Sequence, residues 1–156
     1  MKNLLLALAL LCVLTSCSKD DTPDAMTTEF AAGEYPQKWQ LVKMTGNIAN
    51  APALTGAAMP WQEFYVFNSN SSFTKTRERN GVTTAASGTF KIENLTTEKL
   101  LTLTYSSTND IIGSCTSAEA TETLGFMSDG TLHNTWNACD GPGLAYKRVK
   151  FEAGDN

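Results

Sequence analysis

The feature that most constrains the fold is an alternation of apolar and polar residues with a period of two, which begins at residue 35 and continues almost to the end of the chain. It is clearest at 99–105 (KLLTLTY), where Leu101, Leu103 and Tyr105 share one face and two threonines share the other. This is the pattern of a half-buried strand. Further strands are predicted at 37–45, 61–68, 72–80, 82–93, 111–116, 121–128, 131–138 and 144–151.

Turn-forming residues separate these segments. Asn80-Gly81 is the strongest hairpin signal, because a type I′ turn needs positive φ at both central residues. No stretch carries an amphipathic pattern of ten residues, and 46–60 is expected to be a long loop because it contains glycine and two prolines. Nine short strands with hairpin spacing predict an all-β barrel or sandwich.

The N-terminus has the features of an export signal. A Lys at position 2 precedes an uninterrupted apolar run over 4–14, which is too short to span about 30 Å of hydrocarbon as a helix. Leu14-Thr15-Ser16-Cys17 resembles a bacterial lipobox, in which the Cys is acylated and becomes the mature N-terminus. We therefore expect 1–16 to be a removed signal peptide and acyl chains on Cys17 to hold the protein on a membrane. The alternative is an ordinary signal peptide that is cut elsewhere.

The residues after Cys17 bear on the compartment. Lys19, Asp20 and Asp21 resemble the export signal of Bacteroidota lipoproteins that reach the outer face of the outer membrane. A charged, solvated linker facing the periplasm is the alternative. Because 18–34 is polar, contains proline and lacks a sustained period, we expect 17–34 to be a lipidated, flexible tether and 35–152 to be the folded domain.

Several short segments carry a family resemblance. They are KWQLV at 38–42, the hairpin at 67–73, SGTFKI at 87–92, LTLTY at 101–105, Cys115 and FMSDGTL at 126–132. In these residues the chain resembles the lipocalin-like domain of many small Bacteroidota lipoproteins, over roughly 36–151. The resemblance implies a single antiparallel up-and-down barrel of about eight to nine strands, with a Trp at its floor.

The compartment also predicts how the cysteines are used. Cys12 lies in the leader and Cys17 is the acylation site, so Cys115 and Cys139 remain as one pair. In an oxidising space a disulfide is the expected state of such a pair. A redox dithiol or a metal site is the alternative, but there is no CxxC motif and His133 is the only other soft ligand.

Charged residues on the predicted strands allow two interpretations. Lys75, Arg77 and Arg79 alternate along one strand, as do Arg148 and Lys150. If they point into the barrel mouth they could bind an anion; if they point outward they form a solvated surface, with Glu63 and Glu78 close enough to pair. The solvated surface is the interpretation that we favour from sequence.

The sequence excludes several functions. The formal net charge is -4, which disfavours nucleic acid as a partner. A single histidine, His133, which we expect to be at the surface or loosely packed, and the lack of known nucleotide, zinc or nucleophile motifs predict no enzyme, no cofactor and no metal.

Two functions remain. The barrel could bind a small apolar or amphipathic ligand through Trp61, Tyr65, Tyr105 and Trp136. Alternatively, it could be a structural or interaction module of an envelope complex that contacts a protein partner through 46–60, Met59, Pro60 and Trp61. An eight-stranded barrel can be filled by side chains or can hold one small ligand, and the sequence leaves both open.

Overall fold

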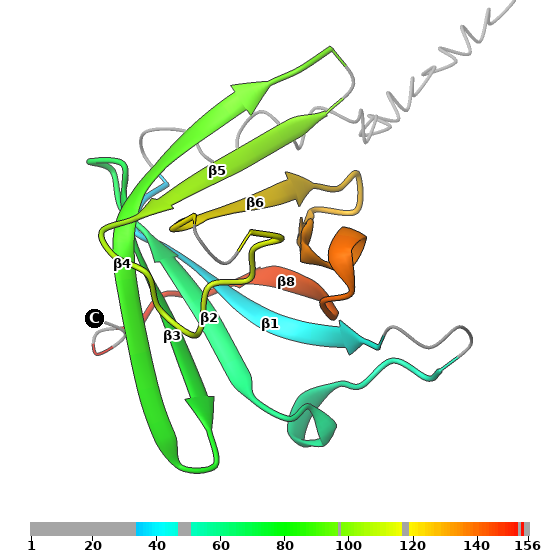
Figure 1. Cartoon of the computed structure of the whole chain (residues 1–156). Helices are drawn as coiled ribbons and strands as arrows, with labels where there is room; N and C mark the ends of the chain where they lie inside the picture. The colour runs from blue at the N-terminus through cyan, green and yellow to red at the C-terminus, as the bar shows by residue number, and fades with distance from the viewer. Residues whose placement is uncertain (1–33, 47–50, 97, 117–118, 153, 155–156) are drawn as a thin grey trace, which may run out of the picture.

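The chain folds into a closed barrel of eight antiparallel strands, seen in a computed structural model that describes residues 34–46, 51–96, 98–116, 119–152 and 154 (Figure 1). The strands are β1 (Gln37–Thr45), β2 (Gln62–Phe67), β3 (Ser72–Arg79), β4 (Val82–Asn94), β5 (Lys99–Tyr105), β6 (Thr121–Phe126), β7 (Thr131–Asn134) and β8 (Gly143–Val149). Two 3-10 helices, η1 (Gly56–Ala58) and η2 (Trp136–Cys139), lie in connections. Each strand pairs with its neighbours in the chain and β8 closes onto β1, which confirms the predicted all-β, up-and-down barrel.

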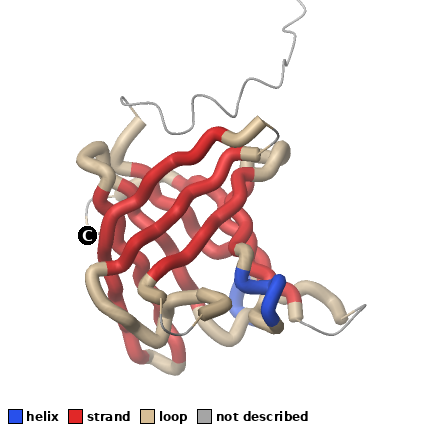
Figure 2. Tube along the Cα trace, turned by 45° about the horizontal axis from the view of Figure 1, so that its top comes forward, coloured by secondary structure: helices blue, strands red, loops and turns tan. Residues whose placement is uncertain are grey.

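Local sequence accounts for the turns and the curvature of the sheet. Asn80 and Gly81 both have positive φ, at 55° and 77°, so the β3–β4 turn is the hairpin that the sequence predicts. A Cβ on Gly88 would lie 2.0 Å from the carbonyl oxygen of Thr104, so only glycine lets the long strand β4 approach β5 so closely. Figure 2 shows the strands of the closed sheet wrapping around the barrel at a tilt.

The connections define two ends of the barrel. The turns β2–β3, β4–β5 and β6–β7 lie at one end, which we call the floor, and the other four connections lie at the opposite end, which we call the mouth. In Figure 1 the β4–β5 hairpin is at the top and the β3–β4 hairpin at the bottom. Arg148 Nη2 contacts Glu34 Oε2 at 2.9 Å, so both ends of the folded domain meet at the floor.

The interior has an apolar layer at the floor and a polar layer toward the mouth. Large buried side chains fill the floor layer, among them Trp39, Phe67, Phe73, Phe90 and Phe126. Their rings pack edge to face, as in the pair Trp39 and Phe126, whose centroids are 5.8 Å apart. Trp39 is fully buried, as expected for a floor tryptophan. The polar layer is formed by side chains from β2, β3, β5, β6 and β8 and holds the candidate site.

Two of the strand predictions are wrong: 111–116 as a whole and 131–138 in its second half. Residues 111–116 form no strand, because the polar groups of this backbone bond to side chains in the barrel instead of to a neighbouring strand. The predicted strand 131–138 ends at Asn134, and η2 follows, closed by Asp140 with a left-handed φ of 69°. In both segments the apolar residues anchor a loop to the barrel. Apolar residues used in this way give the same local sequence pattern as those of a short strand.

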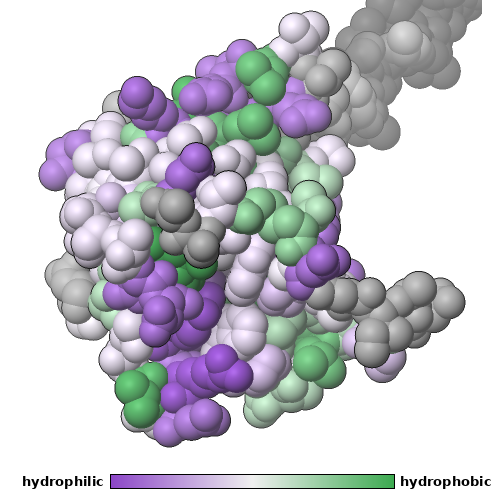
Figure 3. Space-filling view, in the orientation of Figure 1, coloured by the Kyte–Doolittle hydropathy of each residue, from purple (hydrophilic) through white to green (hydrophobic). Residues whose placement is uncertain are grey.

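The face in Figure 3 is largely polar or neutral, with hydrophilic side chains gathered at the lower left, near the β3–β4 hairpin of Figure 1. In the described ranges, no helix combines the length and the apolar character needed to cross a membrane.

Candidate functional site

A carboxylate at the start of β6 is the centre of the polar layer. Glu122 is 5% exposed, yet both of its carboxylate oxygens accept hydrogen bonds. Oε1 accepts hydrogen bonds from the Lys75 ammonium at 2.6 Å and from the backbone N–H of Gly113. Oε2 accepts hydrogen bonds from the hydroxyls of Tyr65, at 2.8 Å, and of Tyr105. Burial alone would raise the pKa of Glu122, but the adjacent Lys75 charge and the hydrogen bonds outweigh it and hold the pKa below its ordinary value.

Lys75 connects Glu122 to a second buried carboxylate, Glu63, which also pairs with Arg77. Lys75, with no exposed surface, also lies 3.4 Å from Glu63 Oε1. The Nε of Arg77 donates to Glu63 Oε2 at 2.5 Å. Two negative and two positive groups therefore balance within the barrel, which is the condition for keeping such charges buried.

Three tyrosines complete this arrangement, which we call the buried polar network and define as Glu63, Tyr65, Lys75, Arg77, Tyr105, Glu122 and Tyr146. Tyr146 donates to Glu63 Oε1 at 2.5 Å. Burial, followed by the nearby carboxylates, raises the pKa of Tyr65, Tyr105 and Tyr146 well above the ordinary tyrosine value. Each of the three hydroxyls donates a hydrogen bond to a buried carboxylate.

The inward position of Lys75 and Arg77 shows that the solvated-surface interpretation is wrong for these two residues of β3. Lys75 and Arg77 are 0% and 7% exposed and point into the barrel. The predicted pairing with Glu63 exists, but it is buried and not solvated. Arg79, one step nearer the mouth, is exposed. Arg148 and Lys150 lie on the outside, where they contact Glu34 and Glu152.

The β5–β6 connection enters the mouth and rests on this network. Arg77 Nη2 donates to the carbonyl of Ile111 at 3.1 Å, and the N–H of Gly113 reaches Glu122. Ile111 is 4% exposed and Gly113 is buried. A Cβ on Gly113 would lie 2.8 Å from Trp136 Cε3 and 3.0 Å from Glu122 Oε1, so this close approach requires glycine. We call residues 110–113 the plug segment.

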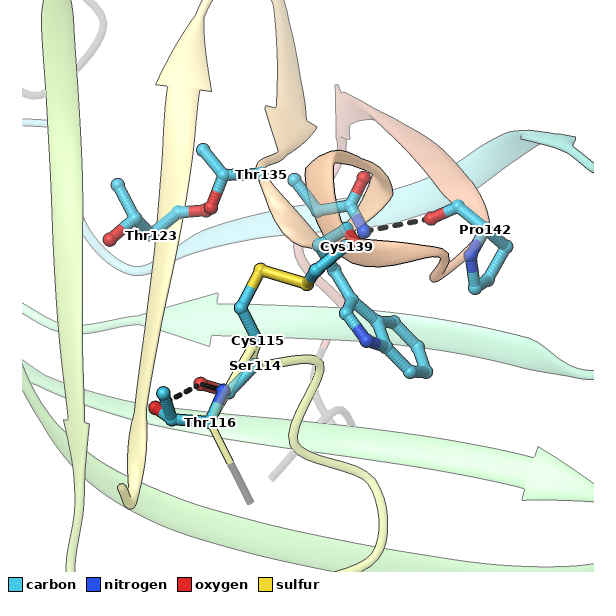
Figure 4. The surroundings of a disulfide bond; sticks show 9 residues. Ser114, Cys115, Thr116, Thr123, Thr135, Cys139 and Pro142 are labelled. Carbon is cyan, nitrogen blue, oxygen red and sulfur yellow. Dashed lines mark hydrogen bonds between the residues drawn. A yellow bond between two sulfur atoms is a disulfide. The ribbon is translucent and has the colours of Figure 1, made fainter. Parts of the chain in front are cut away.

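A disulfide joins the β5–β6 connection, just after the plug segment, to η2 in the β7–β8 connection. Cys115 and Cys139 are bonded, with Cα atoms 5.6 Å apart, as the sequence predicts. Figure 4 shows the bond between the connection that follows Ser114 and the 3-10 helix η2, with Thr123 and Thr135 close by. Closing a loop of this length stabilises a fold by about 3.5 kcal/mol on the chain-entropy model. The bridge therefore limits how far the plug segment can leave the network.

Two of the hollows at the mouth share Asp110 of the plug segment. The larger, of about 360 Å³, we call the Trp136 hollow. Trp136 and Ile112 give it apolar surface, and the rest of its lining is hydroxyl, amide and carboxylate groups from Thr108, Asn109, Asp110, Ser114, Thr116 and Glu119. Its volume lies at the lower end of the range of about 300–1,000 Å³ that is usual for small-molecule sites.

The second hollow, of about 280 Å³, we call the arginine hollow. It is lined by Arg77, Arg79, Asn80, Val82, Thr84, Asp110 and Ile111. The guanidinium carbons of Arg77 and Arg79 lie 4.6 and 5.6 Å from the ring centroid of Trp61, whose face therefore supports both cations. The indole Nε1 of Trp61 is buried and has no hydrogen-bond acceptor in the described part of the chain.

The structure separates the four residues predicted to bind ligand. Trp136 borders the larger hollow and Trp61 supports the arginine hollow. Tyr65 and Tyr105 lie deeper, 1% and 5% exposed, where their hydroxyls serve Glu122. In the loop proposed as a protein contact, Met59 is only 6% exposed, which corrects the expectation that it is available at the surface.

The predicted anchor residues Cys17, Lys19, Asp20 and Asp21 lie outside the described residues. His133 is half-buried on β7. Among the described residues, no group of three or more His, Cys, Asp or Glu side chains is placed to hold a metal ion.

The sequence carried a weak signal for the network that we did not use. Glu63 and Glu122 occupy positions of β2 and β6 that share a face with buried aromatic or aliphatic residues, as Lys75 does on β3. Alternation therefore placed these charges inside. The acids on β2 and β6 and the two bases on β3 all occupy inward positions, where they can neutralise one another. This complementarity of charge was the signal in the sequence that indicated a buried network.

Comparison with known proteins gives no relative: no family model, no curated protein and no solved structure matches the chain.

Proposed function

We propose that the chain is an outer-membrane lipoprotein, anchored through acyl chains on Cys17 and facing the cell exterior, whose barrel binds one small amphipathic molecule in the Trp136 hollow. The observation that carries the ligand-binding proposal is the hollow itself, about 360 Å³ at the mouth of a rigid barrel. The plug segment beside this hollow is held by the bond from Gly113 to Glu122 of the buried polar network, and the disulfide holds the connection that follows it. A preorganised concave site of this kind loses little entropy when it binds.

The lining of the hollow favours an amphipathic ligand over a purely apolar one. Trp136 and Ile112 can cover one apolar face of a molecule. Hydroxyl, amide and carboxylate groups border the rest, and burying these against hydrocarbon without hydrogen bonds would be costly. A compact molecule with one apolar face and several hydroxyl or amine groups therefore fits best.

The position of the chain ends supports an anchored orientation. Glu34, the first described residue, contacts Arg148 at the floor. A segment leading to Cys17 starts from that end, opposite to the mouth. A barrel held in this way would turn both hollows away from the membrane and toward soluble ligands.

The test is to purify the native lipoprotein beside two tryptophan variants and to identify bound compounds by mass spectrometry of extracts. Thr108→Trp places a large ring in the Trp136 hollow, at an exposed residue whose side chain forms no hydrogen bond within the described part of the chain. Thr83→Trp, on the outer face of β4, is the matched control. We expect one compound in near-stoichiometric amount with the wild type and the control and a loss with Thr108→Trp. No compound with any chain, or equal amounts with all three, would contradict the proposal.

A second function is favoured by the filled axis of the barrel. Tyr65, Lys75 and Tyr146 occupy its centre with almost no exposed surface. A barrel whose interior is filled by its own side chains is suited to be a non-catalytic accessory subunit. Such a subunit would contact its protein partner through the mouth loops. Cross-linking in intact outer membranes would support this alternative if one partner is captured by the wild type and lost in a variant with altered mouth loops.

A further inference from the structure

We propose that the arginine hollow is a second binding site, which takes the carboxylate, or a similar anionic group, of a small organic molecule. This site shares Asp110 of the plug segment with the Trp136 hollow, and the proposal does not depend on the function of that hollow. It rests on three observations about the donors at the β3–β4 end of the mouth.

The first observation is that two guanidinium groups border one hollow. Arg77 uses Nε for Glu63 and Nη2 for the Ile111 carbonyl, and its Nη1 has no partner among the described residues. Arg79 forms no ion pair in the described part of the protein and lies exposed at the rim. Both therefore retain N–H groups for a ligand, and guanidinium groups bind carboxylates with two parallel hydrogen bonds.

The second observation is that the arginines are held in place. The Trp61 ring lies under both guanidinium groups, at 4.6 and 5.6 Å, and Arg77 is fixed further by its bond to buried Glu63. Long cationic side chains usually lose rotamer entropy when they bind. Here the ring has already restricted them, so less entropy remains to be lost on binding an anion.

The third observation is the unsatisfied indole of Trp61. Its Nε1 is buried and lacks an acceptor in the described structure. Buried donors are normally paired, and an exception calls for an explanation such as an absent ligand. Trp61 lines an adjoining hollow of about 300 Å³ that shares Asn80 with the arginine hollow, so this unsatisfied donor belongs to a residue beside the arginine hollow and not to its lining.

One residue in the hollow opposes an anion. Asp110 borders it as well and brings a negative charge close to Arg79. The charge of Arg77 is already matched by Glu63, so Arg79 supplies the attraction that Asp110 reduces. Binding should therefore weaken when Arg79 is neutralised and strengthen when Asp110 is neutralised, a pair of opposite effects that nonspecific adsorption would not produce.

The experiment uses two probes of the same shape, phenylacetate and the uncharged phenylacetamide, titrated into the mature lipoprotein in neutral detergent micelles. Binding is measured by calorimetry and by the indole N–H signals in nuclear magnetic resonance spectra. We expect phenylacetate to bind about fivefold more tightly than phenylacetamide, since one partly exposed charge interaction contributes about 1 kcal/mol. The Trp61 signal should move, and the Trp39 signal at the floor should not.

Four variants test where phenylacetate binds. Arg79→Gln should abolish the preference for phenylacetate, and Asp110→Asn should raise phenylacetate affinity about twofold by removing a partly screened repulsion. Lys91→Gln makes the same charge change on the outer face near the floor and should change nothing. Thr108→Trp should also leave phenylacetate binding intact, because it fills the other hollow.

The proposal is overturned by any of four results: equal binding of the two probes, no effect of Arg79→Gln, equal weakening by Lys91→Gln, or loss of phenylacetate binding in Thr108→Trp. Melting temperatures of the variants confirm that each remains folded. None of these results bears on the compound extracted from the Trp136 hollow, so the two proposals can fail separately.

Discussion

The ammonium of Lys75 lies 2.6 Å from Glu122 Oε1, and this ion pair is enclosed in the barrel with side chains that are 0% and 4% exposed. The lysine also reaches Glu63 at 3.4 Å, so a single cation connects carboxylates from β2 and β6 across the interior. It forms the base on which the plug segment rests. The following predictions test this network and the segment above it.

Removing the cation should destabilise the fold strongly. In Lys75→Met, two buried carboxylates face each other without their shared partner, and breaking a buried pair in this way costs about 3 to 5 kcal/mol. Lys91→Met, on the exposed outer face of β4, should change the free energy of unfolding by no more than about 0.5 kcal/mol. Chemical denaturation measures both. A loss in Lys75→Met no larger than in the control would refute the role of the pair.

Acid should release the stabilisation that comes from Glu122. Its pKa in the folded protein lies below its ordinary value of 4.5, so its contribution is fully present above that pH and disappears as the pH falls through the lower folded pKa. The wild type should therefore lose stability on acidification more steeply than Glu122→Gln, which lacks the titrating group. Parallel slopes for the two proteins, measured by denaturation at a series of pH values, would contradict this assignment.

The network tyrosines should resist ionisation. Tyr65, Tyr105 and Tyr146 have pKa values raised well above the ordinary value of 10.0, so the stability that they contribute is complete below that pH and is lost as the pH rises. An absorbance titration of the native chain should show tyrosinate from these three only as the protein unfolds. In concentrated denaturant all four tyrosines of the chain should titrate near 10. Reversible ionisation of more than one tyrosine in the folded protein would contradict the arrangement.

The plug segment should not accept a side chain at Gly113. In Gly113→Ala the added methyl meets Trp136 Cε3 at 2.8 Å and Glu122 Oε1 at 3.0 Å, and such overpacking costs about 1 to 3 kcal/mol. Gly46→Ala is the control, because nothing lies within 4 Å of its added atom. Hydrogen exchange at residue 113 should speed up markedly in Gly113→Ala only. Unchanged exchange in both variants would show that the segment is not held by this contact.

The barrel could be predicted from the sequence, because period-two alternation and turn residues are local signals. The bounds of β1 and β5 match the predicted 37–45 and 99–105, and the Asn80-Gly81 turn forms as expected. The disulfide was also predictable, since only one pair of cysteines remained. Local signals failed at 111–116, where two consecutive isoleucines favour a strand but the backbone bonds to the side chains of Arg77 and Glu122.

The site itself was only half predictable. Trp61 and Trp136 could be selected as large aromatic residues near loops, and both border or support the mouth hollows. The buried network was missed because the charges of Lys75 and Arg77 suggested solvent exposure. Only the register of β2, β3 and β6, which is a long-range property, brings Glu63 and Glu122 to face them.

The central claim, that a small molecule occupies the mouth beside Trp136, is tested most directly by the indole N–H signals of the native protein before and after the proposed bound compound is removed. The chain has three tryptophans, which give three resolvable signals. Trp39 donates to Gln37 Oε1 at the floor and serves as the internal control. We predict that the Trp136 signal moves on stripping and returns when the compound is added back, while the Trp39 signal stays fixed. A Trp136 signal that is unchanged by both steps would contradict the claim.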